Sequence, residues 1–247
     1  MRLRFSVPLL AGIALASSLH AQEAAKIKGV VELFTAQGCA SCPPADAAFR
    51  KLIRQGDVVA LAYHVDYWNY LGWSDTMASK DNTARQYAYA RTLGRSGVYT
   101  PQAIVNGRDH MNGADLNAIN VKIDTFQRNG EGLTIPVNAA MKDDELSIKI
   151  GAGQGKANVV VVYFDKEQMV APKGGENNGQ QIAYMHAVSD VETVGMWDGK
   201  AMNIVLPANV LSKAGRRGLA VLLQSSSPSG DPSAIIGATV LTVGSDG

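Results

Sequence analysis

One stretch near the start of the chain decides the fold: residues 29–55, with the sequence GVVELFTAQGCASCPPADAAFRKLIRQ. Its first part, Gly29 to Phe34, is a short, apolar, β-branched run that is typical of a buried strand. A turn that contains Cys39-Ala40-Ser41-Cys42 follows. Apolar residues then recur at helical spacing, and Gly56 fits the end of a helix; they are Ala45, Ala48, Phe49, Leu52 and Ile53. The stretch therefore predicts a strand that delivers a Cys-x-x-Cys motif to the start of a helix.

The next residues continue this alternation of strands and helices. We expect strands over 58–65 and 102–105, helices over 79–93 and 114–127, and a hairpin at Asn106-Gly107. Because the first two strands flank a helical crossover, they should be parallel. This order, with Cys-x-x-Cys at a helix start, predicts a thioredoxin-like domain over residues 27–129.

Proline 101 supports this fold. Thr100-Pro101 stands immediately before the third strand, where thioredoxin-like folds keep a cis-proline. A cis bond there would expose a strand edge to an incoming peptide. The alternative is an ordinary trans proline that starts an edge strand.

The second half of the chain is dominated by strand signals. Asn129-Gly130-Glu131-Gly132 marks a domain boundary. One short helix is expected over 208–214. Strands are expected over 133–141, 146–151, 159–164, 182–188, 201–206, 219–224 and 235–243. Short strands separated by turn signals predict a small antiparallel β-sandwich-like domain over residues 132–244, so the fold class is α/β plus β.

The first 21 residues have the form of a secretory signal peptide. A basic start, Met1 to Arg4, precedes an apolar run, Phe5 to Leu19, and small residues lead to a cleavage site after Ala21. The run is short for a membrane helix, which needs about 20 residues; an uncleaved anchor is the alternative. We therefore expect a periplasmic or secreted protein without stable membrane insertion after cleavage, in a compartment where cysteine pairs can be oxidised.

Composition narrows the function classes. Hydrophobic residues make up 46% of the 247 residues and charged residues 18%, which is enough apolar side chain for a core and excludes general disorder. With 23 Lys and Arg against 22 Asp and Glu, no strong field attracts nucleic acid, so no nucleic-acid partner is expected. Two cysteines are too few for a disulfide-stapled fold or a four-cysteine zinc site.

The cysteine pair is the candidate reactive site. The thiolate is the nucleophile in disulfide exchange, and a helix N-terminus favours the charged form of Cys39. Cys42 lies one turn further on the same face, so Cys39 is the expected attacking thiolate and Cys42 the buried resolving thiol. The alternative is an inert structural disulfide, which would stabilise the fold little because the loop that it closes is short. Two thiolates could also bind copper or zinc with help from His64. No cofactor is expected otherwise.

Several side chains should surround the thiols because the first two strands end at the same sheet edge. His64 and Asp66 could move protons or tune the thiol pKa, and Trp68 and Trp73 could form a substrate platform. The alternatives are a packed histidine, a turn aspartate and aromatic loop core. Thr100 could pair its backbone with a substrate peptide.

Three long blocks of sequence resemble a secreted bacterial family known as domain of unknown function 1223. They are residues 31–46 (VELFTAQGCASCPPAD), 61–73 (LAYHVDYWNYLGW) and 99–107 (YTPQAIVNG), with a weaker match at 175–179 (GENNG). The resemblance spans residues 29–243 and implies a thioredoxin-like domain followed by a β-rich domain in an exported protein. It implies no activity, since the family is named for lacking one. Ala40-Ser41 stands where thioredoxin has Gly-Pro, so no direction of electron flow is implied.

The leading hypothesis is therefore an exported thiol–disulfide oxidoreductase that acts on a cysteine-containing exported protein. Its catalytic residues would be Cys39, Cys42 and Pro101. Two alternatives stay open. The first is copper or zinc handling through the two cysteines with His64. The second is a non-catalytic binding protein on a thioredoxin-like scaffold.

Overall fold

The computed structural model describes residues 26–142, 145–207 and 218–242. The expected signal peptide at 1–21 and the expected helix at 208–214 lie outside these residues. No helix in the described ranges has both the length and the apolar character needed to span a bilayer. The elements in chain order are β1 (Gly29–Thr35), α1 (Cys42–Gln55), β2 (Val58–His64), a 3-10 turn η1 (Asn69–Leu71), α2 (Lys80–Thr92), β3 (Gln102–Val105), β4 (Asp109–Asn112), α3 (Leu116–Arg128), β5 (Val137–Lys142), β6 (Glu145–Ile150), β7 (Ala157–Val170), β8 (Ile182–Trp197), β9 (Met202–Pro207), β10 (Gly218–Ser226) and β11 (Pro232–Thr242).

The expected strand–helix–strand start is confirmed. β1 and β2 are parallel, in register from Gly29 with Val58 to Thr35 with His64. β3 pairs antiparallel with the other edge of β1, and β4 returns along β3. All seven residues of both β1 and β2 are buried, so these two strands form the interior of the sheet next to the cysteine turn.

Local sequence signals set the ends of the elements. Gly56 ends α1 with a φ of 75°, a left-handed conformation that favours glycine. Ser79 caps α2, because its side chain accepts a hydrogen bond from the Asn82 N–H. Asn106 and Gly107 both have positive φ, which matches the tight hairpin expected between β3 and β4.

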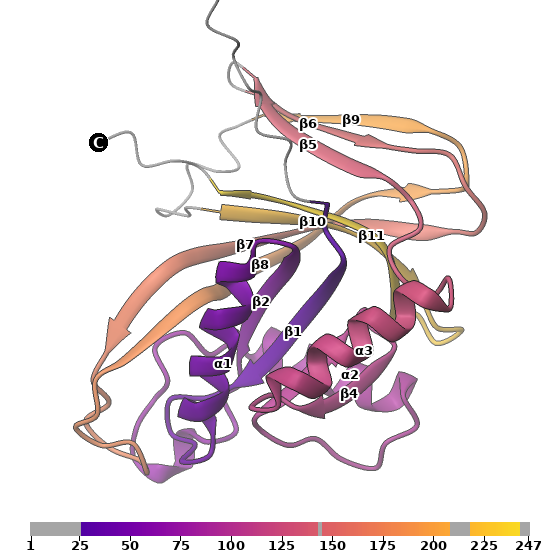
Figure 1. The fold of residues 1–247 in the computed structure, drawn as a ribbon. Helices are drawn as coiled ribbons and strands as arrows, with labels where there is room; N and C mark the ends of the chain where they lie inside the picture. Colours follow the sequence, from indigo (N-terminus) through magenta and orange to yellow (C-terminus); the bar gives the residue numbers. More distant parts are fainter. Residues whose placement is uncertain (1–25, 143–144, 208–217, 243–247) are drawn as a thin grey trace, which may run out of the picture.

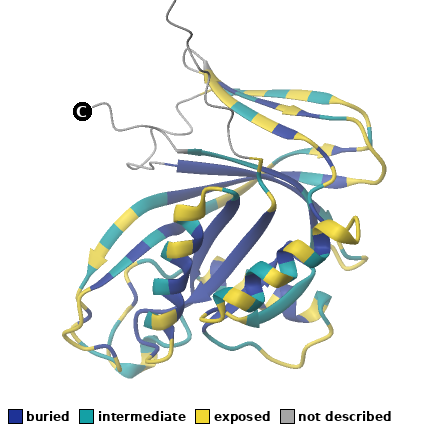
Figure 2. Cartoon of the chain, in the orientation of Figure 1, coloured by how far each residue is buried: buried dark blue, intermediate teal, exposed yellow. Residues whose placement is uncertain are grey.

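Helices cover both faces of this part of the sheet. The apolar sides of α1 and α3 pack on one face through side chains such as Phe49, Leu52 and Ile123. On the opposite face, Tyr89 of α2 joins a core with Phe34 and Tyr63. The inner strands are accordingly buried along their length (Figure 2).

The second half of the chain does not form a separate sandwich. Four of its strands extend the first sheet, which has eight strands in the order β11-β10-β7-β8-β2-β1-β3-β4 (Figure 1). One core cluster contains Val30 and Leu61 from the first half together with Val162, Phe164 and Leu222 from the second. The domain boundary at residues 129–132 stays a prediction. The large sheet and its core nevertheless contain residues from both sides of it.

A narrow junction joins the two halves of the large sheet. β8 runs parallel to β2 and pairs with it only at Ala62 and Ala187. Beside this pair, Nδ1–H of His186 donates to the Ala60 carbonyl over 2.9 Å. Burial lowers the pKa of His186, which favours the neutral imidazole, although the hydrogen bond to Ala60 acts in the opposite direction. The imidazole thus supplements the backbone pairing that links the two halves.

The remaining strands form a small second sheet in the order β5-β6-β9, antiparallel throughout. Its apolar face, with Leu146 and Ile148, packs on the outer face of β7 and β10, where Tyr163 and Val221 are buried. Trp197 closes this core and is 1% exposed. The expected two-layer β arrangement therefore exists, but the large sheet supplies one of its layers.

Candidate functional site around the cysteine pair

The two cysteines form a disulfide at the start of α1. Their Cα atoms lie 5.4 Å apart, and Cys42 is the first residue of the helix. β1 delivers the turn that holds Cys39, as the sequence predicted. Both cysteines are 0% exposed. Burial was expected of Cys42 as the resolving thiol, but not of Cys39 as the attacking one.

Thr100 lies directly beside the disulfide. The Thr100–Pro101 peptide bond is cis, as expected, and Pro101 is buried. The Thr100 hydroxyl donates to Cys39 Sγ over 3.3 Å and accepts from the Trp68 Nε1–H over 2.8 Å. Trp68 thus orients a hydroxyl toward the sulfur, in addition to stacking on the exposed ring of Tyr70.

Most of the backbone donors expected at this helix start are already in use or missing. The Cys42 N–H donates to the Cys39 carbonyl, and the Ala40 N–H donates to the Glu176 carboxylate over 2.9 Å. Pro43 and Pro44 have no N–H. The hydroxyls of Thr100 and Ser41, at 3.3 and 3.4 Å, are the groups that contact Cys39 Sγ at hydrogen-bonding distance.

Asp46 is a buried carboxyl group one helical turn after Cys42. It is 4% exposed, its Oδ1 accepts from the Thr35 hydroxyl over 3.0 Å, and its Oδ2 has no hydrogen-bond partner. Burial raises the pKa of Asp46 to about 7, against the opposing effects of His64, Thr35 and Arg50. Residues four apart on a helix share a face, so Asp46 and Cys42 project to the same side of α1.

His64 belongs to the same buried region but faces Asp75. Its Nδ1 lies 2.8 Å from Asp75 Oδ2, its Nε2 has no hydrogen-bond partner, and its ring meets the ring of Tyr184 edge-on. Burial raises the pKa of Tyr184, and the charges of Asp46 and Asp75 raise it further. These four side chains therefore form one buried polar cluster beneath the cysteine turn.

Asp75 and Trp73 also hold the residues that precede Cys39. The same Asp75 Oδ2 accepts from the Gln37 N–H over 2.7 Å, and the Trp73 Nε1–H donates to Gln37 Oε1 over 2.8 Å. Asp66 is a turn residue instead: its carboxylate accepts from the Thr83 hydroxyl over 2.6 Å and anchors the loop to α2. Trp73 and Asp66 therefore position the loop around the disulfide.

Several residues of this site were not expected from the sequence, among them Asp46, Glu176 and Asn177. The i, i+4 spacing from Cys42 could have indicated Asp46. Glu176 and Asn177 come from the loop between β7 and β8, where Asn177 donates to the carbonyls of Gln37 and Cys39 over 2.9 Å each. No local pattern could have placed that loop, 140 residues beyond Gln37, against the cysteine turn.

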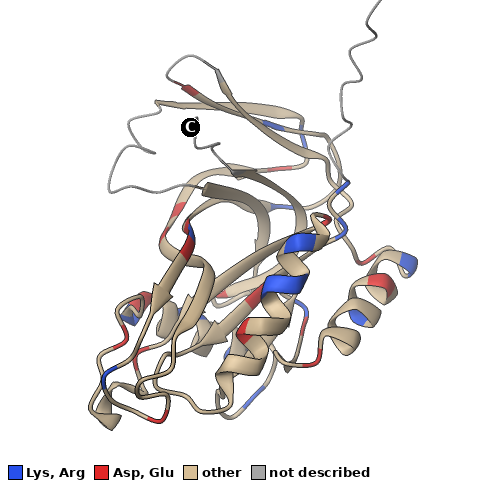
Figure 3. Cartoon of the chain, turned by 60° about the vertical axis from the view of Figure 1, so that its left-hand side comes forward, with Lys and Arg blue, Asp and Glu red and all other residues tan. Residues whose placement is uncertain are grey.

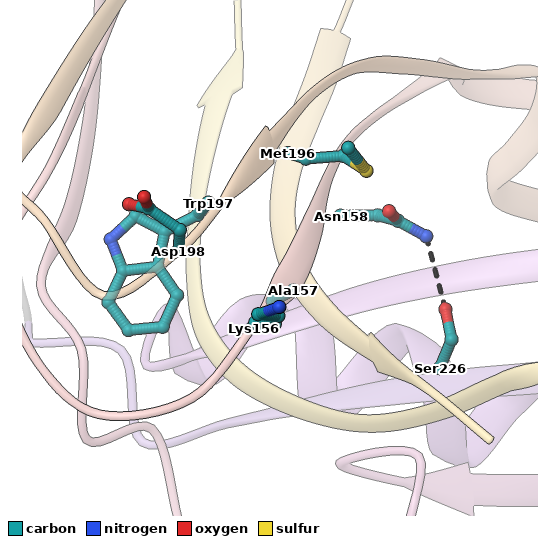
Figure 4. Close-up of a pocket in the computed structure, with 7 residues that line it drawn as sticks. All are labelled: Lys156, Ala157, Asn158, Met196, Trp197, Asp198 and Ser226. Atoms are coloured by element: carbon teal, nitrogen blue, oxygen red, sulfur yellow. Dashed lines mark hydrogen bonds between the residues drawn. The ribbon is translucent and has the colours of Figure 1, made fainter. Parts of the chain in front are cut away.

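Other parts of the described chain offer weaker candidates for a functional site than the cysteine pair. The described ranges hold no cluster of three or more His, Cys, Asp or Glu side chains arranged for a metal ion. Lys and Arg positions are interspersed with Asp and Glu positions in Figure 3 and do not gather in one region of the view. A hollow of about 390 Å³ lies at the opposite end of the β7–β8 hairpin from the disulfide (Figure 4), and no cysteine lines it; the lining residues are Lys156, Ala157, Asn158, Met196, Trp197, Asp198 and Ser226.

Fold and site together define a class: a mixed α/β sheet protein with a Cys-x-x-Cys disulfide at the start of its first helix. Within that class, the chain belongs to the family described as protein of unknown function (DUF1223), whose model matches residues 30–224. The resemblance noted in the sequence is thereby confirmed. No curated protein matches the chain.

Two solved structures are similar to this chain. The crystal structure of protein AGR_C_4864 from Agrobacterium tumefaciens is 58% identical, with a TM-score of 0.84, and the match covers 92% of this chain and 98% of that one. HBP35 of Porphyromonas gingivalis is 17% identical, with a TM-score of 0.60 and coverage of 89% and 76%. The second likeness concerns the fold alone.

Proposed function

We propose that this protein is a thioredoxin-like thiol–disulfide oxidoreductase. One observation carries the proposal: a Cys-x-x-Cys disulfide at the head of α1 has the Thr100 hydroxyl on Cys39 Sγ, directly before the cis Pro101. A short disulfide loop contributes little to stability, so its use in exchange is the better explanation for its position.

The reaction needs only the two cysteines and a partner disulfide. In the reduced protein, the Cys39 thiolate attacks one sulfur of the partner, and the other partner sulfur leaves as a thiolate and takes up a proton. Cys42 then loses its proton and attacks Cys39 Sγ, which releases the second partner thiolate. Two electrons pass from the Cys39/Cys42 dithiol to the partner, and the reverse sequence oxidises a partner dithiol.

Two neighbouring groups support these steps. The Thr100 and Ser41 hydroxyls can donate to the Cys39 thiolate, and hydrogen bonds to charged groups are the stronger ones. Asp46 can accept the proton of Cys42, because its Oδ2 has no hydrogen-bond partner and its pKa of about 7 leaves it partly ionised near neutral pH. We assign Cys39 as nucleophile, Cys42 as resolving thiol and Asp46 as proton acceptor.

The partner that fits this chemistry is a cysteine-containing protein in the periplasm or outside the cell. The signal-peptide pattern of residues 1–21 supports that location, where disulfides persist. The exposed ring of Tyr70, stacked on Trp68 beside Thr100, offers an apolar surface next to the site.

The deciding experiment is the equilibrium reduction potential of the cysteine pair, measured by thiol alkylation and mass shift in glutathione buffers. Exchange catalysts lie between about −120 and −270 mV, and we expect a value in that range. A value below about −300 mV would identify a structural disulfide and refute the proposal.

Cysteine variants test the assigned roles. Cys42→Ser should accumulate mixed disulfides with a partner protein, whereas Cys39→Ser should abolish exchange. Thr100→Val should slow exchange by about tenfold, since it removes one donor to the thiolate. A Cys39→Ser protein that exchanges disulfides at the normal rate would contradict the mechanism.

A further inference from the structure

The disulfide is closed off from solvent. Cys39 and Cys42 are both 0% exposed, yet exchange needs a thiolate to approach along the line of the sulfur–sulfur bond. Some element must therefore move before a partner protein can react. The loop between β7 and β8, residues 171–181 (Figure 1, lower left), contacts the cysteine turn through Glu176 and Asn177; we call it the strap.

Asn177 fixes the strap to the cysteine turn. Its Nδ2 donates to the carbonyls of Gln37 and Cys39, both over 2.9 Å, and the residue is 1% exposed. Next to it, the Glu176 carboxylate accepts from the Ala40 N–H over 2.9 Å. Two consecutive strap residues thus bond to three residues of the turn that presents Cys39.

Glycines let the strap come close to the backbone beneath it. A Cβ at Gly174 would lie 2.5 Å from the Gly72 carbonyl oxygen, and one at Gly175 would lie 3.2 Å from the Gly38 Cα. The Gly175 N–H also donates to the Leu71 carbonyl. The strap therefore touches both the cysteine turn and the aromatic loop that follows β2.

Few apolar contacts hold the strap. Within residues 171–181, only Pro172 and Asn177 are buried, and the residues around them are exposed or half-buried. A segment held by a few polar bonds at its surface opens at low free-energy cost compared with a packed core. The Asn177 amide contributes most to the cost of opening the strap. When the strap opens, both carbonyls that accept from this amide must bind water in its place.

We infer that the strap is a gate over the disulfide, latched by Asn177, that lifts to admit the thiol of a partner. This inference rests on the proposed function. When the gate is open, an incoming thiolate attacks Cys39 Sγ, the bond to Cys42 breaks, and the Cys42 sulfur leaves as a thiolate that takes up a proton. A second thiol then resolves the mixed disulfide, so two electrons reach the cysteine pair.

The test compares Asn177→Ala with Asn178→Ala, a matched change at the exposed neighbouring residue. The oxidised full-length protein is mixed with dithiothreitol, and the appearance of free thiols is followed by quenched alkylation. Reoxidation of the dithiol form by oxidised glutathione is measured in parallel. We expect Asn177→Ala to speed both reactions by about tenfold, from the loss of two hydrogen bonds, and Asn178→Ala to change neither by more than about twofold.

The combination of rates and potential separates the explanations. A latch slows both directions, so both rates rise together. If Asn177 only tuned the redox equilibrium, one rate would rise, the other would fall and the potential would shift, which would overturn the gate. Unchanged rates in Asn177→Ala would also overturn it. A wild-type potential below about −300 mV would instead refute the proposed function, whatever the variants do.

Discussion

Replacing Asp46 with asparagine should remove most of a pH dependence of stability that the buried carboxyl creates. Burial raises the pKa of Asp46 to about 7 in the folded protein, whereas an unfolded aspartate titrates at about 3.9. Each pKa unit between the two states is worth ~1.4 kcal/mol, so the ionised carboxylate costs the folded protein ~4 kcal/mol. Ionisable groups that interact with Asp46 come from four elements around it: Arg50 on α1, His64 on β2, Asp75 in the following loop and Tyr184 on β8.

The sign follows from which state holds the proton. Below about pH 4 the carboxyl is protonated in both states and costs nothing. As pH rises toward 7, the unfolded chain loses the proton first, so the free energy of unfolding falls; above about pH 7 the loss is complete. The wild-type protein should therefore lose up to ~4 kcal/mol from this group between about pH 4 and about pH 8, and Asp46→Asn should not.

The assay is urea unfolding of the oxidised proteins at several pH values, followed by circular dichroism. The quantity to compare is the difference in free energy of unfolding between variant and wild type at each pH. The difference between variant and wild type at about pH 4 measures any cost of placing an amide beside Thr35. This cost is present at every pH, so it is subtracted from the differences at higher pH. Wild-type and variant curves that run parallel across the whole pH series would refute the assignment of a raised pKa to Asp46.

Three further predictions concern other parts of the chain. Arg85→Leu should destabilise the protein by about 3–5 kcal/mol in urea unfolding, because it leaves the buried Glu32 carboxylate, 2.7 Å from the guanidinium, without its charged partner; a loss below about 1 kcal/mol would contradict this. The fragment 27–129 should lack a cooperative unfolding transition, because β2 would lose β8 and the shared core; a sharp two-state melt would show that it folds alone. Glu176→Gln should speed reduction by 3-mercaptopropionate about twofold at low salt and leave cysteamine reduction nearly unchanged, because a carboxylate beside the disulfide repels anionic thiols. Equal acceleration by both thiols would contradict it.

Much of the first half of the fold could be predicted because its signals are local. The strand–turn–helix of residues 29–55 follows from apolar periodicity, and the ends of α1 and α2 follow from Gly56 and Ser79. The same holds for the hairpin at Asn106-Gly107, whereas the cis bond before Pro101 was expected from its place in thioredoxin-like folds. Each of these features depends on residues within a few positions of one another, where backbone sterics and short hydrogen bonds decide the conformation.

The candidate site was predictable only in part. The sequence grouped Cys39, Cys42 and Thr100 in one site through the thioredoxin-like pattern, in which a proline follows Thr100 directly before the third strand. It did not show that Asp66 turns away to Thr83, or that Trp68 donates to the Thr100 hydroxyl. Side-chain direction in a loop depends on the neighbours that the loop packs against, which periodicity does not encode.

By itself, then, the sequence determined the local elements, the position of the cysteine pair at a helix start and the β-rich character of the second half. The tertiary structure alone decided that β8 adds to the edge of β2, that one sheet spans both halves and that Asn177 reaches the cysteine turn. The physical reason is that strand pairing and loop docking depend on which distant surfaces can bury one another and satisfy each other's backbone groups. The apolar pattern of a strand shows that it needs a partner, and only the folded chain shows which partner it has.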